Sequence, residues 1–407
     1  MVINMIQRNE YIKKIIPLID TKFIKILSGV RRSGKSTILN MIEKYLIDDK
    51  GIKKDSIIHM QLDSFQYENI KDGHSFYNYL VDLIDRDDEK KYLLLDEVQE
   101  VYNWEKCVNS LMNEKNVDII VTGSNSKLMS SEISTYLTGR YVSIMVFPLS
   151  FKEFIEFRNL PDNLINRQTT LNEYIRIGGF PGIVINIENE IDNYAVVKDI
   201  YNSVVLSDIM ARYSIRNQEL FDRIVKFIFE NVGKTFSANS IKNFLKSEGR
   251  NIDIETIFNY ISYLEKAFII YKCQRYDLQG KNVLKTQEKY FLADQSFKYA
   301  LFGFNPKSVA AMMENIIYLE MRRRGYNVFV GKLDSKEIDF VGIKQDKKVY
   351  IQSARSIPND SDREINNLMQ IKDNYPKYII TLDQFSVGII DGIEITLLCD
   401  FLLNENW

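Results

Sequence analysis

The chain of 407 residues carries 53 Lys+Arg against 55 Asp+Glu, which gives a formal net charge of −2. Its 45 % hydrophobic and 12 % aromatic residues are enough to form buried cores, and this excludes a largely disordered protein. The balance of charge excludes a uniformly basic surface of the kind that binds nucleic acid non-specifically, but it leaves a local basic patch open.

Cysteine and histidine are scarce, with three cysteines far apart in the sequence and only His59 and His74. A disulfide framework, a cysteine-based zinc site and Ser-His-Asp chemistry are therefore not expected. No apolar run approaches the roughly 18 residues of a membrane-spanning helix, and charged residues interrupt the N-terminus, unlike a signal peptide. We expect a soluble protein of the cytoplasm that has no membrane partner.

Residues 1–150 alternate apolar runs with helical patterns, which predicts an α/β fold built on a parallel sheet. The expected helices include Ser36–Leu46 and Trp104–Asn113. The expected strands are Phe23–Leu27, Ile57–Leu62, Tyr92–Leu95, Val117–Thr122 and Val142–Phe147.

A phosphate-binding motif, G-x-x-x-x-G-K-[ST], joins the first expected strand to a helix. Such a loop turns its backbone N–H groups toward phosphate oxygens, and the helix adds its positive N-terminal end. Lys35 is expected to reach the β- and γ-phosphates, and the Ser36 hydroxyl to hold Mg²⁺. The alternative is a chance glycine turn before a helix. The candidate nucleotide-binding residues are Gly29, Val30, Arg31, Arg32, Ser33, Gly34, Lys35, Ser36 and Thr37.

Two carboxylates, Asp96 and Glu97, follow the apolar run Tyr92–Leu95. A buried central strand would deliver Asp96 to the Mg²⁺ at its C-terminal edge. Glu97, next in the chain, is placed to polarise an attacking water as general base. The acidic motif alone is weak, but the phosphate-binding motif upstream makes it strong.

Polar residues follow the expected strand Val117–Thr122. Ser124 or Asn125 is expected to contact the γ-phosphate or to orient the water, and the sequence does not choose between them. The alternative is a polar turn that caps the next helix.

Three arginines complete the set of candidates. Arg140, just before the fifth expected strand, is expected to stabilise charge on the γ-phosphate, either in cis or from a neighbouring subunit. A surface ion pair is the alternative for Arg140. Arg31 and Arg32, inside the loop, rank behind it because side chains at these positions usually point outward.

Together these motifs resemble the AAA-like P-loop ATPases of bacteria and archaea that carry a C-terminal domain of unknown function. The similarity extends over nearly the whole chain. It implies the sheet order of additional-strand ATPases, ATP with Mg²⁺, and slow, switch-like hydrolysis, but no particular cellular task. The segments that carry it are Leu27–Ser36, Leu95–Gln99, Thr122–Ser126, Leu137–Tyr141, Phe147–Phe151 and Gly178–Gly182.

The middle of the chain is expected to be helical, with a lid or connector at 151–216 and a winged helix-turn-helix at 217–300. Ser237 is the expected N-cap of the second helix of this module. Two wing strands should follow the third helix. The expected helices are Leu220–Asn231, Ala238–Lys246 and one from Asp253 or Ile254 to about Ala267.

Charge does not decide what this middle module binds. Residues 206–300 hold 15 Lys+Arg against 11 Asp+Glu, but the third helix carries Asp253, Glu255 and Glu265 against a single Lys266. Acidic side chains on a recognition helix oppose DNA binding. Non-specific backbone contacts through the wing and a protein–protein role both stay open. The basic wing residues are Lys272, Arg275, Lys281 and Lys285.

Residues 301–407 are expected to form a C-terminal α/β module that resembles the restriction-endonuclease-like fold, with a helix Ser308–Arg324 and strands that follow it. In that fold, an acidic residue on one strand and the glutamate of an E-x-K triplet on the next bind a divalent metal ion, and the lysine supports the attacking water. Asp339 occupies the first position, but Gln352 and Ala354 replace the glutamate and the lysine, so nuclease activity is not expected. Asp339 and Glu320 are weak candidates for residual metal binding.

The sequence therefore predicts an ATPase that uses ATP and Mg²⁺ and repositions its C-terminal modules with the nucleotide state. An ATP-gated nucleic-acid-binding regulator without nuclease activity is the main alternative, and a nucleotide-dependent scaffold without turnover is another. Whether the partner is DNA, RNA, a protein or a second copy of the chain stays open. The catalytic candidates are Lys35, Glu97, Ser124, Asn125 and Arg140.

Overall fold

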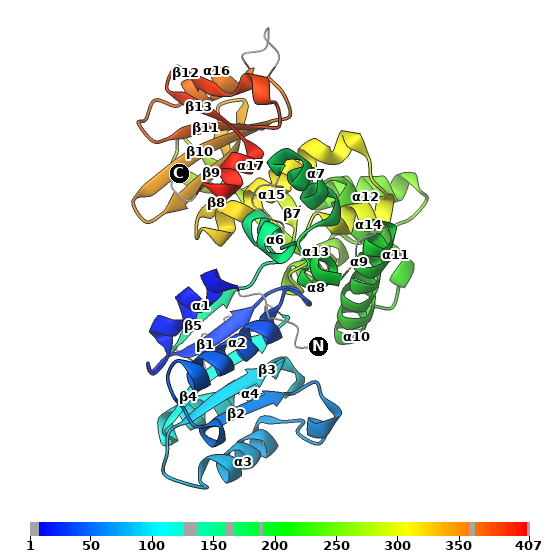
Figure 1. The fold of residues 1–407 in the computed structure, drawn as a ribbon. Coiled ribbons are helices and arrows are strands. Elements are labelled where there is room, and N and C mark those ends of the chain that lie inside the picture. Colours follow the sequence, from blue (N-terminus) through cyan, green and yellow to red (C-terminus); the bar gives the residue numbers. More distant parts are fainter. Residues whose placement is uncertain are drawn as a thin grey trace. The chain divides into compact units, whose positions relative to one another are not determined.

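The computed structural model describes residues 8–125, 137, 139–159, 166–186, 190–357 and 363–404. The chain divides into two compact units, each with its own sheet: Met1–Val146 with Lys266–Phe268, and Phe147–Glu265 with Ile269–Trp407 (Figure 1). Among the described residues, no helix is both long enough and apolar enough to cross a membrane.

The first unit is built on a five-stranded parallel sheet with the strand order β2-β3-β4-β1-β5. This confirms the predicted parallel α/β fold and all five of its expected strands. β4 lies between β1 and β3, so the strand that ends in the acidic motif (β3) and the strand before the phosphate loop (β1) are not direct neighbours. The strands are β1 (Ile24–Ser28), β2 (Ile57–Gln61), β3 (Lys91–Asp96), β4 (Val117–Gly123) and β5 (Tyr141–Met145).

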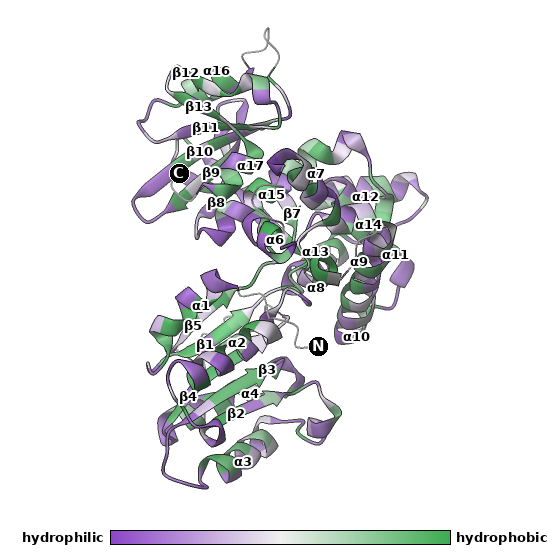
Figure 2. Cartoon of the chain, viewed as in Figure 1, coloured by the Kyte–Doolittle hydropathy of each residue, from purple (hydrophilic) through white to green (hydrophobic). Residues whose placement is uncertain are grey.

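Helices cover both faces of this sheet. Helices α1 (Asn9–Ile15) and α2 (Lys35–Asp48) bury their apolar residues on one face, and α3 (Gly73–Ile84) and α4 (Trp104–Glu114) on the other. Successive residues of a strand serve opposite cores, as Leu93 and Leu94 do in β3. The central strands β1 and β3 are therefore buried along their whole length and are mostly apolar, as Figure 2 shows.

The second unit begins with a helical region. The helices Gln218–Glu230, Ala238–Ser247 and Ile254–Lys266 match the three expected in the middle module. Ser237 caps the second of them by accepting a hydrogen bond from the Ser240 amide, as predicted. The helices are α6 (Phe151–Phe157), α7 (Arg167–Ile177), α8 (Pro181–Asn186), α9 (Glu190–Tyr201), the π-helical segment Asn202–Ile209, α10 (Met210–Tyr213), α11 (Gln218–Glu230), α12 (Ala238–Ser247) and α13 (Ile254–Lys266).

An eight-stranded sheet forms the rest of this unit, in the order β12-β13-β11-β10-β9-β8-β6-β7. Its helices are α14 (Ser296–Phe302), α15 (Val309–Arg323), α16 (Arg363–Met369) and α17 (Leu398–Leu403). Its strands are β6 (Ile270–Asp277), β7 (Asn282–Leu292), β8 (Asn327–Leu333), β9 (Lys336–Lys344), β10 (Lys347–Ala354), β11 (Lys377–Thr381), β12 (Gly388–Ile390) and β13 (Ile393–Leu397).

The hairpin β6–β7, expected as a wing, continues this sheet. β6 pairs in parallel with β8, where Arg275 lies opposite Val330 and Asp277 opposite Lys332. The middle and C-terminal modules of the sequence-based prediction therefore share one sheet.

A glycine pair anchors the beginning of the second unit. Gly178 has φ +83°, and a Cβ there would lie 2.0 Å from a carboxylate oxygen of Asp294. The Gly179 amide donates to the other oxygen of Asp294 at 2.7 Å, and the Gly179 carbonyl accepts from the Leu149 amide at 2.7 Å. Only glycine fits such an approach, so this turn is explained by packing.

Candidate functional site

The phosphate-binding motif forms a loop between β1 and α2, as predicted. Gly29 has φ +156°, and a Cβ there would lie 2.1 Å from the Val146 carbonyl oxygen. Gly34 has φ +98° at the position that precedes α2. Both glycines therefore occupy places that a larger residue would disturb. The loop ends at the N-terminus of α2, where free N–H groups and the helix dipole favour an anion.

Lys35 lies in the first turn of α2 and turns back over the loop. Its Nζ donates to the carbonyl oxygens of Gly29 and Val30, both at 3.2 Å, and lies 3.8 Å from Oε1 of Glu97. The side chain is 3 % exposed. Burial lowers the pKa of Lys35, although the carboxylates of Glu97 and Asp96 oppose this effect. A phosphate would add negative charge next to this buried ammonium and so favour its charged form.

Asp96, the last residue of β3, meets Ser36 at the same edge of the sheet. Its carboxylate accepts hydrogen bonds from the Ser36 hydroxyl and from Oγ1 of Thr122. Burial raises the pKa of Asp96 despite these two donors. The predicted pair of Mg²⁺ ligands, Ser36 and Asp96, is therefore assembled in one place.

Glu97 follows with φ +54°, which is uncommon for a residue with a side chain. Its amide donates to Oγ1 of Thr122 at 3.0 Å, and its Oε2 accepts from the Ser124 hydroxyl at 3.1 Å. The sequence left open whether Ser124 or Asn125 belongs to the site. The Ser124 hydroxyl contacts the Glu97 carboxylate. Asn125, the next residue, is buried, with only 1 % of its surface exposed.

The remaining loop residues differ in exposure. Val30 is fully buried, Arg31 is half-buried, and Arg32 is exposed with φ +63°. Thr37 is exposed in the first turn of α2. Arg31 is close enough to Lys35 to lower the pKa of that lysine further.

Arg140 does not join this group, which corrects the expectation that it lies at the nucleotide edge. β5 runs parallel to β1, with Tyr141 opposite Ile24, and the Arg140 carbonyl accepts from the Ile24 amide at 2.8 Å. Arg140 therefore lies at the beginning of β1, whereas the phosphate loop follows the end of that strand. Its guanidinium donates to Oδ1 of Asn113.

Three residues that contact the site are not among the candidates predicted from the sequence. Arg8 is 1 % exposed and donates from its guanidinium to the Ser33 carbonyl of the loop at 2.7 Å. Thr122 bridges Asp96 and Glu97, and the Gln99 amide donates to Oε2 of Glu97. Gln99 and Thr122 carried a signal, since they belong to the segments Leu95–Gln99 and Thr122–Ser126 that support the family resemblance, whereas Arg8 carried none.

The residues present fit a nucleotide with Mg²⁺. The Ser33 hydroxyl is fully buried inside the loop and has no hydrogen-bond partner among the described residues. Lys35 is buried with its positive charge, and Asp96 and Ser36 offer oxygen ligands of the kind that Mg²⁺ prefers. An unpaired donor, a buried cation and oxygen ligands are the groups that a magnesium-bound phosphate chain would satisfy.

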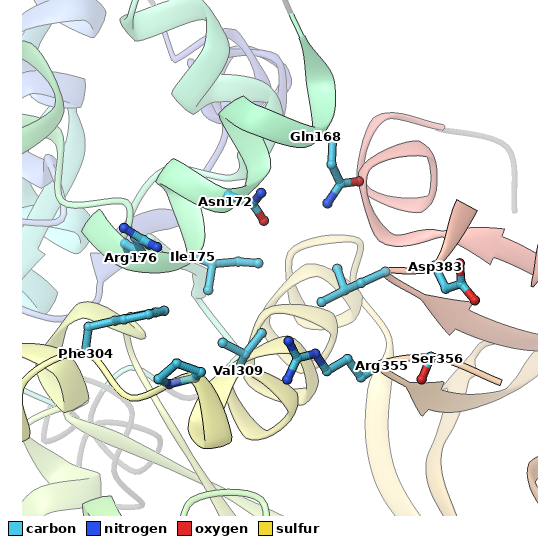
Figure 3. Close-up of a pocket in the computed structure, with 11 residues that line it drawn as sticks. Gln168, Asn172, Ile175, Arg176, Phe304, Val309, Arg355, Ser356 and Asp383 are labelled. Carbon is cyan, nitrogen blue, oxygen red and sulfur yellow. The ribbon is translucent and has the colours of Figure 1, made fainter. Parts of the chain in front are cut away.

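A cavity of about 490 Å³ is lined by described residues of the second unit (Figure 3). One side is formed by α7, with Gln168, Asn172 and Arg176 at successive turns. Arg176 covers the Phe304 ring at 4.3 Å, and Asp383 turns its carboxylate to the Phe385 amide and the Ser386 hydroxyl. No member of the phosphate-binding motif lines this cavity.

Asp339 and Gln352, two of the positions at which a nuclease motif was sought, belong to a buried polar cluster in the second unit. Asp339 of β9 accepts two hydrogen bonds from Ser353, and its amide donates to Oε1 of Gln352 at 3.1 Å. Among the described parts of the chain, no group of three or more His, Cys, Asp or Glu is arranged to hold a metal ion. Glu320, the second candidate in the sequence, instead forms ion pairs with Arg323 and Arg324.

Lys289 of β7 supplies the positive charge of this cluster. Its Nζ lies 2.8 Å from Glu337 and 3.5 Å from Glu314. Burial disfavours the ammonium, but the carboxylates of Glu314, Asp339 and Glu337 outweigh it and raise the pKa of Lys289. Burial, with the nearby Asp339 carboxylate, raises the pKa of Glu314 from 4.5 to about 8.

We expect the stability of this unit to fall as the pH rises from about 4.5 to about 8, because of Glu314. Below about 4.5 the folded and unfolded states both hold its proton, whereas between the two pKa values only the folded state does. The effect should be on the order of 2–4 kcal/mol, and Glu314→Gln should flatten this part of the stability–pH curve. Urea unfolding at several pH values measures it. The exposed Glu255→Gln variant is the control, and equal slopes in wild type and Glu314→Gln would contradict this prediction.

Comparison with known proteins agrees with this architecture. Residues 21–155 match the model of an AAA domain, and residues 168–308 match a domain of unknown function, DUF8612. An uncharacterized protein of Haemophilus influenzae is 40 % identical over 98 % of this chain and 99 % of its own length. The chain belongs to its family of AAA-domain proteins. Another uncharacterized protein, MJ1544 of Methanocaldococcus jannaschii, is 32 % identical over 86 % of this chain and 78 % of its own length.

Among solved structures, this AAA-domain protein is similar to the Walker-type ATPase PABY2304 of Pyrococcus abyssi. The similarity covers 73 % of this chain and 95 % of that chain, at 14 % identity and a TM-score of 0.44.

Proposed function

We propose that this protein is an Mg²⁺-dependent ATP hydrolase. The observation that carries the proposal is the meeting of Lys35, the Ser36–Asp96 pair and Glu97 at one edge of the parallel sheet. Each of these residues has the chemistry of one part of such a site: a cation for phosphate oxygens, ligands for a metal ion, and a base for water.

Lys35 and the N–H groups of the loop would hold the phosphate chain, and Ser36 and Asp96 would hold Mg²⁺. When bound, Mg²⁺ neutralises charge that develops on the phosphate oxygens. Glu97 would take a proton from water as the water oxygen bonds to the terminal phosphorus and the bond to the β-phosphate oxygen breaks, giving ADP and phosphate.

The decisive experiment compares wild type with Lys35→Ala. We expect wild type to bind and hydrolyse ATP in the presence of Mg²⁺, and Lys35→Ala to bind ATP about 10–100 times more weakly, since a hydrogen bond to a charged group contributes about 1.5–3 kcal/mol. Calorimetric titration with a non-hydrolysable ATP analogue and a phosphate-release assay provide the two measurements. Lys44→Ala, an exposed lysine on the same helix, is the matched control. Wild type that neither binds nor hydrolyses ATP would overturn the proposal.

We further propose that the parts downstream act as modules that respond to the nucleotide. In this assignment residues 151–216 form a connector, 217–300 a winged helix-turn-helix-like module and 301–407 a restriction-endonuclease-like module. The three helices α11–α13 followed by the hairpin β6–β7 support the second assignment, and β8–β10 with α15 support the third. A trans role of Arg140 toward a neighbouring subunit belongs to this proposal as well.

The second candidate function is an ATP-gated regulator that binds nucleic acid without cutting it. The local basic excess of residues 206–300 supports it, with Lys281 exposed at the turn of the β6–β7 hairpin; the side chain of Lys285 lies outside the described part of the structure. We expect salt-sensitive DNA or RNA binding that weakens when Lys281 and Lys285 are both replaced by alanine. A gel-shift series at several salt concentrations tests it, and equal binding by wild type and the double variant would contradict it.

A further inference from the structure

Glu97 is held from several directions at once. Its backbone is fixed by the hydrogen bond to Thr122, whose hydroxyl also donates to Asp96. Its φ of +54° also indicates that the backbone is constrained, because a residue with a side chain rarely adopts this region unless its surroundings impose it. The position of the carboxylate therefore depends on β4 as well as on its own strand.

The two oxygens of the Glu97 carboxylate have different surroundings. Oε1 lies 3.8 Å from Nζ of Lys35. Oε2 accepts from the Ser124 hydroxyl at 3.1 Å and from the Gln99 amide nitrogen. Gln99 Nε2 also lies 3.5 Å from the Ser124 hydroxyl, so these groups form one small network.

Gln99 leaves one group unused in this network. It lies in the short 3-10 turn Val98–Glu100, directly after Glu97. Its amide oxygen is buried and has no hydrogen-bond partner among the described residues. The nitrogen must be the end that faces Glu97, since a carbonyl oxygen there would face a carboxylate. The free end is therefore an acceptor, and a buried acceptor without a partner costs about 1–3 kcal/mol.

We propose that Gln99 is a positioning residue of the hydrolytic site: its amide nitrogen orients the Glu97 carboxylate, and its free amide oxygen accepts a hydrogen bond from the attacking water. This inference rests on the proposed ATP hydrolysis. A water between Gln99 and Glu97 would donate one hydrogen to each, so that one proton points at the base. Ser124, which donates to the same carboxylate oxygen, limits its rotation.

The test is a cycle of variants in the full-length chain: Gln99→Ala, Glu97→Gln, and both together. We expect Gln99→Ala to lower kcat for ATP hydrolysis by about 10–100-fold, a part of the usual effect of acid–base catalysis, with the affinity for a non-hydrolysable ATP analogue changed less than about threefold. In the Glu97→Gln background, Gln99→Ala should lower the residual rate by less than about threefold, because both hydrogen bonds of Gln99 serve the transfer of a proton from water to Glu97, and this transfer is already lost there. Gln66→Ala, at an exposed position of the same unit, is the matched control.

If Gln99 had only a structural role, these variants would behave differently. If Gln99→Ala lowers kcat by the same factor in both backgrounds, or weakens nucleotide binding as much as it lowers kcat/KM, the proposal is overturned. If Gln99→Ala does not fold, Gln99→Met, which is neutral and of similar size, takes its place, with the same loss of kcat expected since its side chain cannot donate to Glu97. Wild type without turnover overturns the proposed function and this inference together, whereas active wild type with kcat unchanged in Gln99→Ala overturns this inference alone.

Discussion

Glu97→Gln should lower kcat for ATP hydrolysis by a factor of about 10²–10⁴ while ATP still binds with an affinity close to that of wild type. Glutamine has nearly the same shape as glutamate, and its amide oxygen still accepts from Ser124. What it loses is the ability to take a proton. The contacts that hold phosphate, centred on Lys35 and the loop, do not depend on this carboxylate as a base.

A phosphate-release assay and an ATP-binding titration, run on the same preparations, measure this prediction. The exposed Glu68→Gln variant, in the same unit, controls for the loss of one negative charge. Full activity in Glu97→Gln would show that another group is the base, and loss of binding would assign Glu97 to the phosphate contacts instead. Tight binding with no turnover even in wild type would favour the scaffold alternative.

The second large effect concerns stability, at a buried ion pair below the phosphate loop. Lys25 of β1 donates to Oδ1 of Asp118 in β4, and both side chains are at most 1 % exposed. The other oxygen of Asp118 accepts from the Asp20 amide at 2.5 Å. Burial lowers the pKa of Lys25, and the Asp118 charge opposes this. Lys25→Met would leave a buried carboxylate without its cation, at a cost of about 3–5 kcal/mol.

We therefore expect Lys25→Met to lower the melting temperature of the first unit by about 10 °C. Differential scanning calorimetry, which resolves the transitions of separate units, measures this shift. Lys53→Met removes the exposed partner of Glu89 and should leave the melting temperature almost unchanged. A shift of similar size in both variants would contradict the assigned role of burial. Since β1 leads directly into Gly29, reduced nucleotide affinity should accompany the loss of stability.

The phosphate loop and the acidic strand end were predictable because their signals are local. A short apolar run, a glycine-rich loop and a helix occur in immediate succession, and so do the apolar run of β3 and its two carboxylates. The position of Arg140 in its own chain was not predictable for a different reason: only the direction of β5 relative to β1 shows at which edge of the sheet that residue lies.

The other differences also depend on contacts between distant segments. Arg8 reaches the loop from the position just before α1, and Thr122 reaches Glu97 from a neighbouring strand. On α15, the sequence favoured Glu320, whereas Glu314 faces Lys289 and Asp339. The hydrophobic pattern of a helix does not state which strand each of its faces will meet.

The pairing of β6 with β8 limits how this chain can be divided. The predicted boundary between the middle and C-terminal modules is at residue 300, and the DUF8612 match ends at 308, but the sheet continues across both. A fragment ending there would retain the β6–β7 hairpin with one edge of β6 stripped of its partner. Unpaired strand edges recruit other chains, so such a fragment should aggregate, and studies of isolated pieces should keep the whole sheet, residues 270–397, together.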